Sequence, residues 1–309
     1  MSVEDGFRGT IILENVSLAG ERGIPCIDIG KKCNVNLQIA GENELRTGGI
    51  RVPDSSVLTV VGDGNLTINL NSGKYFGIGN SLDEYHGELN FYQDGGIIIN
   101  ANGMKGIGIG SGLGGFINIK RGHYEFDMKG QEGACIGSVN GDSELLIEYC
   151  DMDIYSGISN GTIIGSVNGD ADIKLENISA KLQGAGNIIT GIGTIAGNSC
   201  MVRLENVNIS SNIRAKECYG IGCRAGRTDI YIGYAAVKSV VQGKAAVAFG
   251  NSVMSAKLYC SNADIGTNAV TEFNSDIGAL EKNIQLENGR AEFILNGQEI
   301  KRQILAARL

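Results

Sequence analysis

Residues 134–142 read ACIGSVNGD, and 28 residues later residues 162–170 read TIIGSVNGD. Related segments flank them: FGIGNS at 76–81, KGIGIGSG at 105–112, TGIGTIAGN at 190–198, YGIGCRAGR at 219–227 and AFGNS at 248–252. We anchor the alignment on Gly79, Gly108, Gly137, Gly165, Gly193, Gly222 and Gly250, whose spacings are 29, 29, 28, 28, 29 and 28 residues. So regular a period is typical of a solenoid, in which each repeat stacks on its neighbours.

The position before each anchor glycine is apolar. It holds Ile78, Ile107, Ile136, Ile164, Ile192, Ile221 and Phe249. Such a column predicts an inward-facing ladder whose rungs are about 4.8 Å apart, the separation of paired strands.

Two further alternating segments follow each anchor. The first holds the pairs Ile117/Ile119, Leu145/Ile147, Ile173/Leu175, Val202/Leu204, Ile230/Ile232 and Leu258/Cys260, and the second holds Ile178/Ala180/Leu182 and Val207/Ile209. Apolar residues recur at i, i+2 and not at i, i+3, i+4, which indicates strands. We therefore predict an all-β fold, a single-stranded right-handed parallel β-helix of about 28 residues per coil, with Asn177, Asn206 and Asn262 stacked at one turn position.

The pattern predicts one β-solenoid domain over residues 1–309. Residues 1–75 form less regular N-terminal coils, residues 76–265 the regular coils, and residues 266–309 the last strands and a cap. In the tail, Ile300, Ile304 and Leu305 have helical spacing. We expect a short C-terminal capping helix there, because the open end of a solenoid recruits other chains.

Composition excludes several classes of partner. Lys and Arg number 26 against 34 Asp and Glu, a net charge of −8, so the chain lacks the basic stripe that a nucleic-acid partner requires. No run approaches 18 apolar residues, so we expect no membrane span. The 47 glycines with only 2 prolines indicate tight turns and close backbone stacking.

The eight cysteines predict buried free thiols. None belongs to a C-x2-C pair, so we expect no metal site, and Cys135, Cys150 and Cys260 occupy apolar positions of the repeat. Free thiols favour a reducing compartment. Residues 1–9 also lack the basic start and apolar core of a signal peptide, which favours a cytoplasmic location or a piece of a larger protein.

Several motifs resemble a known repeat family. They are L-x-x-V-S-L at 13–18, I-x-I-G-x-x-C-x-V-x-L at 27–37, G-G-I-x-V-P-x-x-S-x-L-T-V-x-G-x-G-x-L at 48–66, and the recurring G-I-G-x-G coils. Together they resemble bacterial β-helix repeat domains of the carbohydrate-binding type in Gram-positive surface proteins. The resemblance covers nearly the whole chain. It implies a β-helix, a glycan ligand and a cell-surface location, against the compartment that the cysteines favour.

Two motifs invite a chemical interpretation. Residues 110–115 match G-x-G-x-x-G, but these glycines recur in every coil and no helix follows, so we predict a structural turn and no cofactor. G-S-V-N-G-D ends at Asp142 and again at Asp170. Stacking would bring these carboxylates near the ~5 Å separation of retaining glycosidases. We favour a solvated turn, since Asn and Gly tolerate positive φ, over a calcium site or a catalytic pair.

Three further features are candidate sites. Tyr231 and Tyr259 lie between inward apolar residues, so both should point outward on neighbouring rungs as a ligand-binding platform. His86 is a weak catalytic candidate on an irregular loop, where we expect it to be exposed. The last is a column of outward acidic residues, Glu148, Glu176 and Glu205, which we interpret as a solvated face screened by Lys174 and Arg203.

These observations favour a non-catalytic binding or scaffold module, with an oligo- or polysaccharide as the leading ligand. Two alternatives stay open: a polysaccharide lyase or glycoside hydrolase on a β-helix, and a protein-interaction platform of a cytoplasmic regulator. No nucleic-acid or membrane partner is expected.

Overall fold

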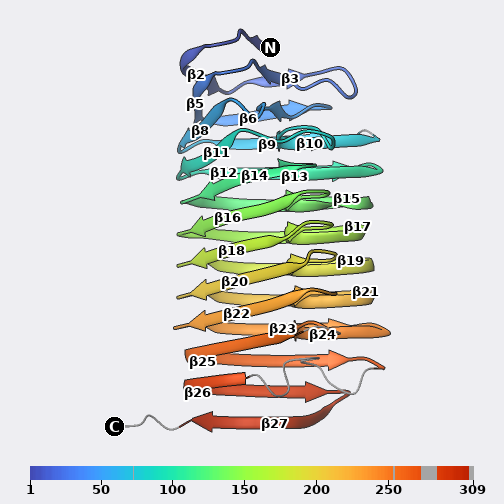
Figure 1. Cartoon of the computed structure of the whole chain (residues 1–309). Coiled ribbons are helices and arrows are strands. Elements are labelled where there is room, and N and C mark those ends of the chain that lie inside the picture. The colour runs from blue at the N-terminus through green and yellow to red at the C-terminus, as the bar shows by residue number, and fades with distance from the viewer. Residues whose placement is uncertain (72, 253–254, 273–283, 306–309) are drawn as a thin grey trace.

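The chain is all-β in the computed structural model, which describes residues 1–71, 73–252, 255–272 and 284–305. Figure 1 shows its coils stacked along one axis from the blue N-terminal end to the red C-terminal end. Strands of successive coils pair in parallel, as predicted for a β-solenoid. Each coil contributes strands to three faces, which we name A, B and C.

Face A runs from β2 near the N-terminus to β26 near the C-terminus. It consists of β2 (Arg8–Glu14), β5 (Asn34–Ala40), β8 (Val57–Gly62), β11 (Glu88–Gln93), β14 (Gly114–Ile119), β16 (Asp142–Glu148), β18 (Ala171–Glu176), β20 (Ser199–Glu205), β22 (Arg227–Gly233) and the first parts of β25 (Ala256–Val270) and β26 (Ile284–Leu295).

Face B follows face A in the chain. It consists of β3 (Ser17–Ala19), β6 (Glu42–Arg46), β9 (Asn65–Leu70), β12 (Gly96–Asn102), the first parts of β15 (Gly122–Ser138), β17 (Cys150–Ser166), β19 (Ser179–Thr194) and β21 (Asn208–Cys223), then β23 (Ala236–Gln242) and the second parts of β25 and β26.

Face C closes each coil. It consists of β1 (Ser2–Val3), β4 (Ile27–Ile29), β7 (Ile50–Arg51), β10 (Lys74–Gly79), β13 (Lys105–Ser111), the second parts of β15, β17, β19 and β21, and β24 (Ala245–Gly250).

The core is one column of side chains inside the three faces. On face C, Ile136 pairs with Ile164, Ile164 with Ile192, and Ile192 with Ile221, and all four side chains are fully buried. This confirms the predicted ladder. The apolar pairs of the first segment after each anchor, from Ile117/Ile119 to Leu258/Cys260, are buried and pair in register on face A.

One anchor of the alignment was wrong by two residues. Gly79 pairs with Gly110, and Gly110 with Gly137, so Gly108 is not the anchor of its coil. The sequence between residues 106 and 110 alternates Gly and Ile, and a shift of two residues keeps every side chain on the same face of a strand. Ile107 therefore leaves the main column and packs in a small separate cluster with Leu82 and Val139.

The corrected anchors share a backbone conformation that requires glycine. Their φ angles lie between +94° and +143°, at Gly79, Gly110, Gly137, Gly165, Gly193, Gly222 and Gly250. A Cβ added at Gly165 would lie 1.9 Å from the carbonyl oxygen of Gly193 in the next coil. Glycine thus lets successive coils approach at this corner.

The turn from face A to face B carries the asparagine column. Asn177, Asn206 and Asn262 all have φ between +51° and +54°, and the amide of Asn206 donates to the side-chain oxygen of Asn177. This confirms the predicted stacking for the first two. Tyr149 and Tyr234 occupy equivalent left-handed turns and are more than 60% exposed.

The predicted C-terminal capping helix is wrong. Residues Gln298–Leu305 form a strand, β27, which pairs antiparallel with β26. A separation of four residues between apolar positions, as in Ile300 and Ile304, fits the period of a strand as well as that of a helix. Residues 306–309, the end of the predicted helix, lie outside the described residues. No helix in the described ranges is long and apolar enough to cross a membrane.

All eight cysteines are free and buried, as predicted. Burial raises the pKa of Cys135, Cys150 and Cys260 to about 12, and that of Cys218 and Cys223 to about 11. Because the thiolate is the reactive form, these side chains are inert parts of the core.

We predict that Gly165→Ala destabilises the protein by about 3 kcal/mol or more, since a positive φ and a close backbone contact each cost about 1–3 kcal/mol. Gly266→Ala is the matched control, because no atom lies within 4 Å of its added Cβ. Urea unfolding should show the control at least as stable as the wild type. Equal losses in the two variants would contradict the close-approach explanation.

We predict that a thiol reagent labels eight cysteines in the unfolded, unreduced protein and almost none in the folded one. The physical reason is that all eight thiols are buried in the folded protein. Mass spectrometry after alkylation gives the count. Two or fewer thiols in the unfolded chain would show that disulfides had formed.

Candidate functional site

The outward side chains of face A line a groove near the C-terminal end of the stack. The groove has a volume of about 780 Å³ and crosses β18, β20, β22, β25 and β26. Alternate residues of a strand point to opposite faces. Ile230 and Ile232 therefore enter the core, and Tyr231 between them points into the groove.

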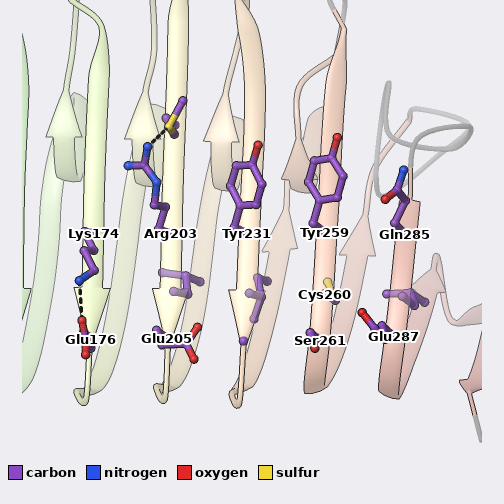
Figure 2. Close-up of a pocket in the computed structure, with 15 residues that line it drawn as sticks. Lys174, Glu176, Arg203, Glu205, Tyr231, Tyr259, Cys260, Ser261, Gln285 and Glu287 are labelled. Atoms are coloured by element: carbon purple, nitrogen blue, oxygen red, sulfur yellow. Dashed lines mark hydrogen bonds and ion pairs between the residues drawn. The ribbon is translucent and has the colours of Figure 1, made fainter. Parts of the chain in front are cut away.

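Tyr231 and Tyr259 form the apolar centre of the groove. The two residues pair across β22 and β25, as predicted, and Tyr231 is 40% exposed. Their ring centroids are 4.9 Å apart and their planes differ by 7°. Carbon atoms in contact lie about 3.5–4 Å apart, so parallel rings with this centroid separation are offset, and each leaves part of one face uncovered. Figure 2 shows both rings side by side on the outside of the sheet.

Small residues beside the tyrosines make room for a carboxylate. Two positions after each ring, the same outward column holds Gly233 and Ser261. A Cβ added at Gly233 would lie 2.3 Å from Oε2 of Glu205, so the Glu205 carboxylate occupies the space over this glycine. The groove therefore holds a hydrogen-bond acceptor two positions along the strand from Tyr231.

Charged side chains border the groove on its N-terminal side. Lys174 Nζ lies 2.6 Å from Glu176 Oε2, and Arg203 Nη1 lies 2.6 Å from Asp172 Oδ1 (Figure 2 shows the first pair). The hydrogen bond to Glu176 raises the pKa of Lys174, so the two groups remain an ion pair.

The acidic column is confirmed in register, because Glu148 pairs with Glu176 and Glu176 with Glu205. Its screening differs from the prediction in one respect. Lys174 contacts the column, but Arg203 turns away to Asp172, and Lys120 reaches Glu148 Oε2 at 3.4 Å instead.

Gln285 and Glu287 on β26 complete the groove on its C-terminal side. These two residues were not predicted, because the glycine anchors of the repeat end at Gly250, one coil before β26. The signal was present in NIQLENG at 283–289, where Ile284 and Leu286 continue the apolar pairs of face A and Gln285 falls in the tyrosine column.

The two aspartates lie at the corner between faces C and A. Asp142 Oδ1 accepts a hydrogen bond from the backbone N of Asp170 at 2.8 Å. Asp170 Oδ1 in turn accepts from the backbone N of Asn198 and Ser199 at 2.6 and 3.0 Å. Each carboxylate thus caps the turn of the next coil, as expected of a structural turn, and Asp170 lies at the opposite end of β18 from Glu176.

His86 is buried, contrary to the prediction of an exposed loop residue. It is 4% exposed, and its ring packs on Gly115, whose added Cβ would lie 2.6 Å from the ring. The Nδ1–H donates to the carbonyl oxygen of Gly87, and the buried Nε2 has no hydrogen-bond partner in the described chain. Burial lowers the pKa of His86 to about 4, although the bond to Gly87 opposes this shift.

Two other kinds of site were considered in the sequence, a metal site and a dinucleotide-binding loop. Within the described ranges, no group of three or more His, Cys, Asp and Glu side chains is arranged to hold a metal ion. The segment 110–115 joins β13 to β14 and precedes no helix, as predicted for a structural turn.

Comparison with protein-family models, with curated proteins and with solved structures finds no match to this chain. The resemblance to carbohydrate-binding β-helix repeats therefore stays a prediction.

We predict that folding stability falls as the pH drops from about 6.5 toward 4. The folded-state pKa of His86 is about 4 against 6.5 in the unfolded chain, so below pH 6.5 the unfolded state takes up the proton. The shift corresponds to about 3 kcal/mol once the pH reaches 4. Urea unfolding at a series of pH values measures it.

The matched variants for this pH series are His86→Leu and His123→Gln. The first removes the buried titrating group and should flatten the dependence between pH 6.5 and 4. The second alters a histidine that is about half exposed, so it should retain the wild-type dependence. The same pH dependence in wild type and His86→Leu would contradict the assignment to His86.

Proposed function

We propose that this chain is a non-catalytic module that binds an extended oligosaccharide along the groove of face A. The observation that carries the proposal is the offset pair of tyrosine rings, 4.9 Å apart, at the centre of that groove. A pyranose ring has an apolar face of C–H groups that packs on aromatic rings. Rings held on successive rungs of a rigid sheet can contact successive sugar units without being ordered on binding.

The polar groups beside the tyrosines support a hydroxyl-rich ligand. Glu205 and Glu287 supply acceptors, Gln285 supplies both donors and an acceptor, and Ser261 supplies a hydroxyl. Lys174 is already paired with Glu176, so the groove presents mixed polar groups and not a field of one sign. That mixture suits a neutral sugar better than a highly charged polymer.

Binding is favoured over turnover because the candidate aspartates and the Glu176 carboxylate already have partners. Asp142 and Asp170 accept backbone hydrogen bonds at another corner of the coil, and Glu176 is held in an ion pair. His86 is buried, and it does not line the groove of face A. A hydrolase or lyase would need an acid and a base free to face the substrate.

We predict that replacing both Tyr231 and Tyr259 by Ala abolishes binding to an oligosaccharide selected on a glycan array. Wild-type affinity should be in the micromolar to millimolar range by order of magnitude, because each ring contributes only modestly. Titration calorimetry measures it. The fold should persist, since both side chains point outward.

The matched control is the double variant Tyr85→Ala/Tyr149→Ala, which removes two exposed tyrosines outside the groove. It should bind like the wild type. Two outcomes would overturn the proposal: unchanged affinity in the Tyr231/Tyr259 variant, or depolymerisation of the polysaccharide by the wild type. The second would support the enzyme hypothesis.

A further inference from the structure

The N-terminal strand of face A has a neighbour on one side only. Within the described chain, β2 pairs with β5 and with no other strand of that face. The backbone N of Asn34 donates to the carbonyl oxygen of Phe7, which places the N–H and C=O groups of residues 7, 9, 11 and 13 toward β5. The same groups of Arg8, Thr10, Ile12 and Glu14 therefore point away, along a free edge.

This edge lacks the features that usually protect one. Ile12 is 57% exposed, more than any other leucine, isoleucine or valine in the described residues. Ile11 faces the core but is only partly buried, whereas the next core residue, Leu13, is 3% exposed. No proline or charge interrupts the segment from Gly9 to Leu13. An exposed apolar edge of this kind is a template for another strand.

The charges of β2 are arranged with opposite signs at its two ends. Arg8 begins the strand and Glu14 ends it, both exposed, and neither has an ion-pair partner in the described chain. In a parallel partner strand of the same sequence, like charges would meet. In an antiparallel partner, opposite charges would meet.

We propose that two copies of this chain pair β2 with β2 in antiparallel orientation, about a two-fold axis at Ile11. In this register Arg8 lies opposite Glu14 of the second copy, Thr10 opposite Ile12, and Ile11 opposite Ile11. The N–H and C=O groups that point away from β5 belong to Arg8, Thr10, Ile12 and Glu14. In this register these residues pair with one another as Arg8/Glu14 and Thr10/Ile12, so all of their free backbone groups form hydrogen bonds across the axis. Two ion pairs, one at each end, close the interface.

The same register continues the core. Paired residues of antiparallel strands lie on one face of the sheet, so Gly9, Ile11 and Leu13 meet their counterparts on the inner side. The partly buried Ile11 becomes covered, and the two cores join end to end. A two-fold contact uses the same surface on both copies and closes on itself, so the assembly stops at a dimer.

The dimer leaves the groove of face A open. The groove lies on β18 to β26, and β2 lies at the other end of the stack (Figure 1). A dimer joined through β2 therefore carries its two grooves at opposite ends, where they could engage one long polymer with a gain in avidity. The dimer itself does not rest on the nature of the ligand.

Cross-linking with single cysteines tests the register. At Ile11 the two Cα atoms would be about 4.5 Å apart, within the range of a disulfide, whereas at Ile12 they would be more than about 7 Å apart. Ile11→Cys should form a disulfide-linked dimer under mild oxidation, and Ile12→Cys should not. The native cysteines are buried and contribute no background. Equal cross-linking of the two variants, or none in either, would overturn the register.

Charge exchange and light scattering test the dimer independently. Arg8→Glu and Glu14→Arg should each weaken dimerisation several-fold, because like charges then face each other. Mixing the two variants should restore a heterodimer, and the Tyr231/Tyr259 double variant should dimerise like the wild type. A wild-type chain that stays monomeric at concentrations of tens of micromolar, or that forms a ladder of larger species, would overturn the proposal.

Discussion

The hydrogen-bonded stacking of one coil on the next is the constraint on which the structure depends. It holds paired strands about 4.8 Å apart on all three faces, so every side chain has a counterpart one rung away. Where the chain turns from face C to face A, this spacing leaves no room for a Cβ, and the anchor glycines with positive φ are required. From Gly137 to Gly250 the anchors recur every 28 or 29 residues, because each coil must place a glycine at this corner.

The same spacing produces the candidate binding surface. Flat rings in full overlap would be closer than one rung, so Tyr231 and Tyr259 tilt until they touch, with centroids 4.9 Å apart. An offset pair presents two partly open faces instead of one closed stack. In the same outward column Lys174 and Arg203 precede the tyrosines, and Gln285 follows them. The backbone is the same from coil to coil, so the groove arises from the residue types that this outward column holds.

The features that recur at the same position of every coil could be predicted from the sequence. The isoleucine column, the outward tyrosines and the stacked Asn177 and Asn206 follow from period two within a fixed coil. Two predictions were wrong because the sequence there fits two structures equally well. An Ile-Gly alternation permits Gly108 or Gly110 as the anchor, and Ile300 and Ile304 fit a helix or a strand. Burial of His86 could not be predicted, because the loop that carries it folds back on Gly115 from another coil.

A solenoid has two ends, and this chain treats them differently. At the C-terminal side β27 reverses direction and pairs antiparallel with residues 289–295 of β26, which ends the parallel stack of face B. At the N-terminal side β2 continues the parallel register and keeps a row of unsatisfied backbone groups at its outer edge. Unpaired backbone groups at either end carry a cost, and an added antiparallel strand offsets it. At the C-terminal end, face B obtains that strand from its own chain. The N-terminal end, with Arg8 and Glu14 at opposite ends of a seven-residue strand, has the symmetry to obtain it from a second copy.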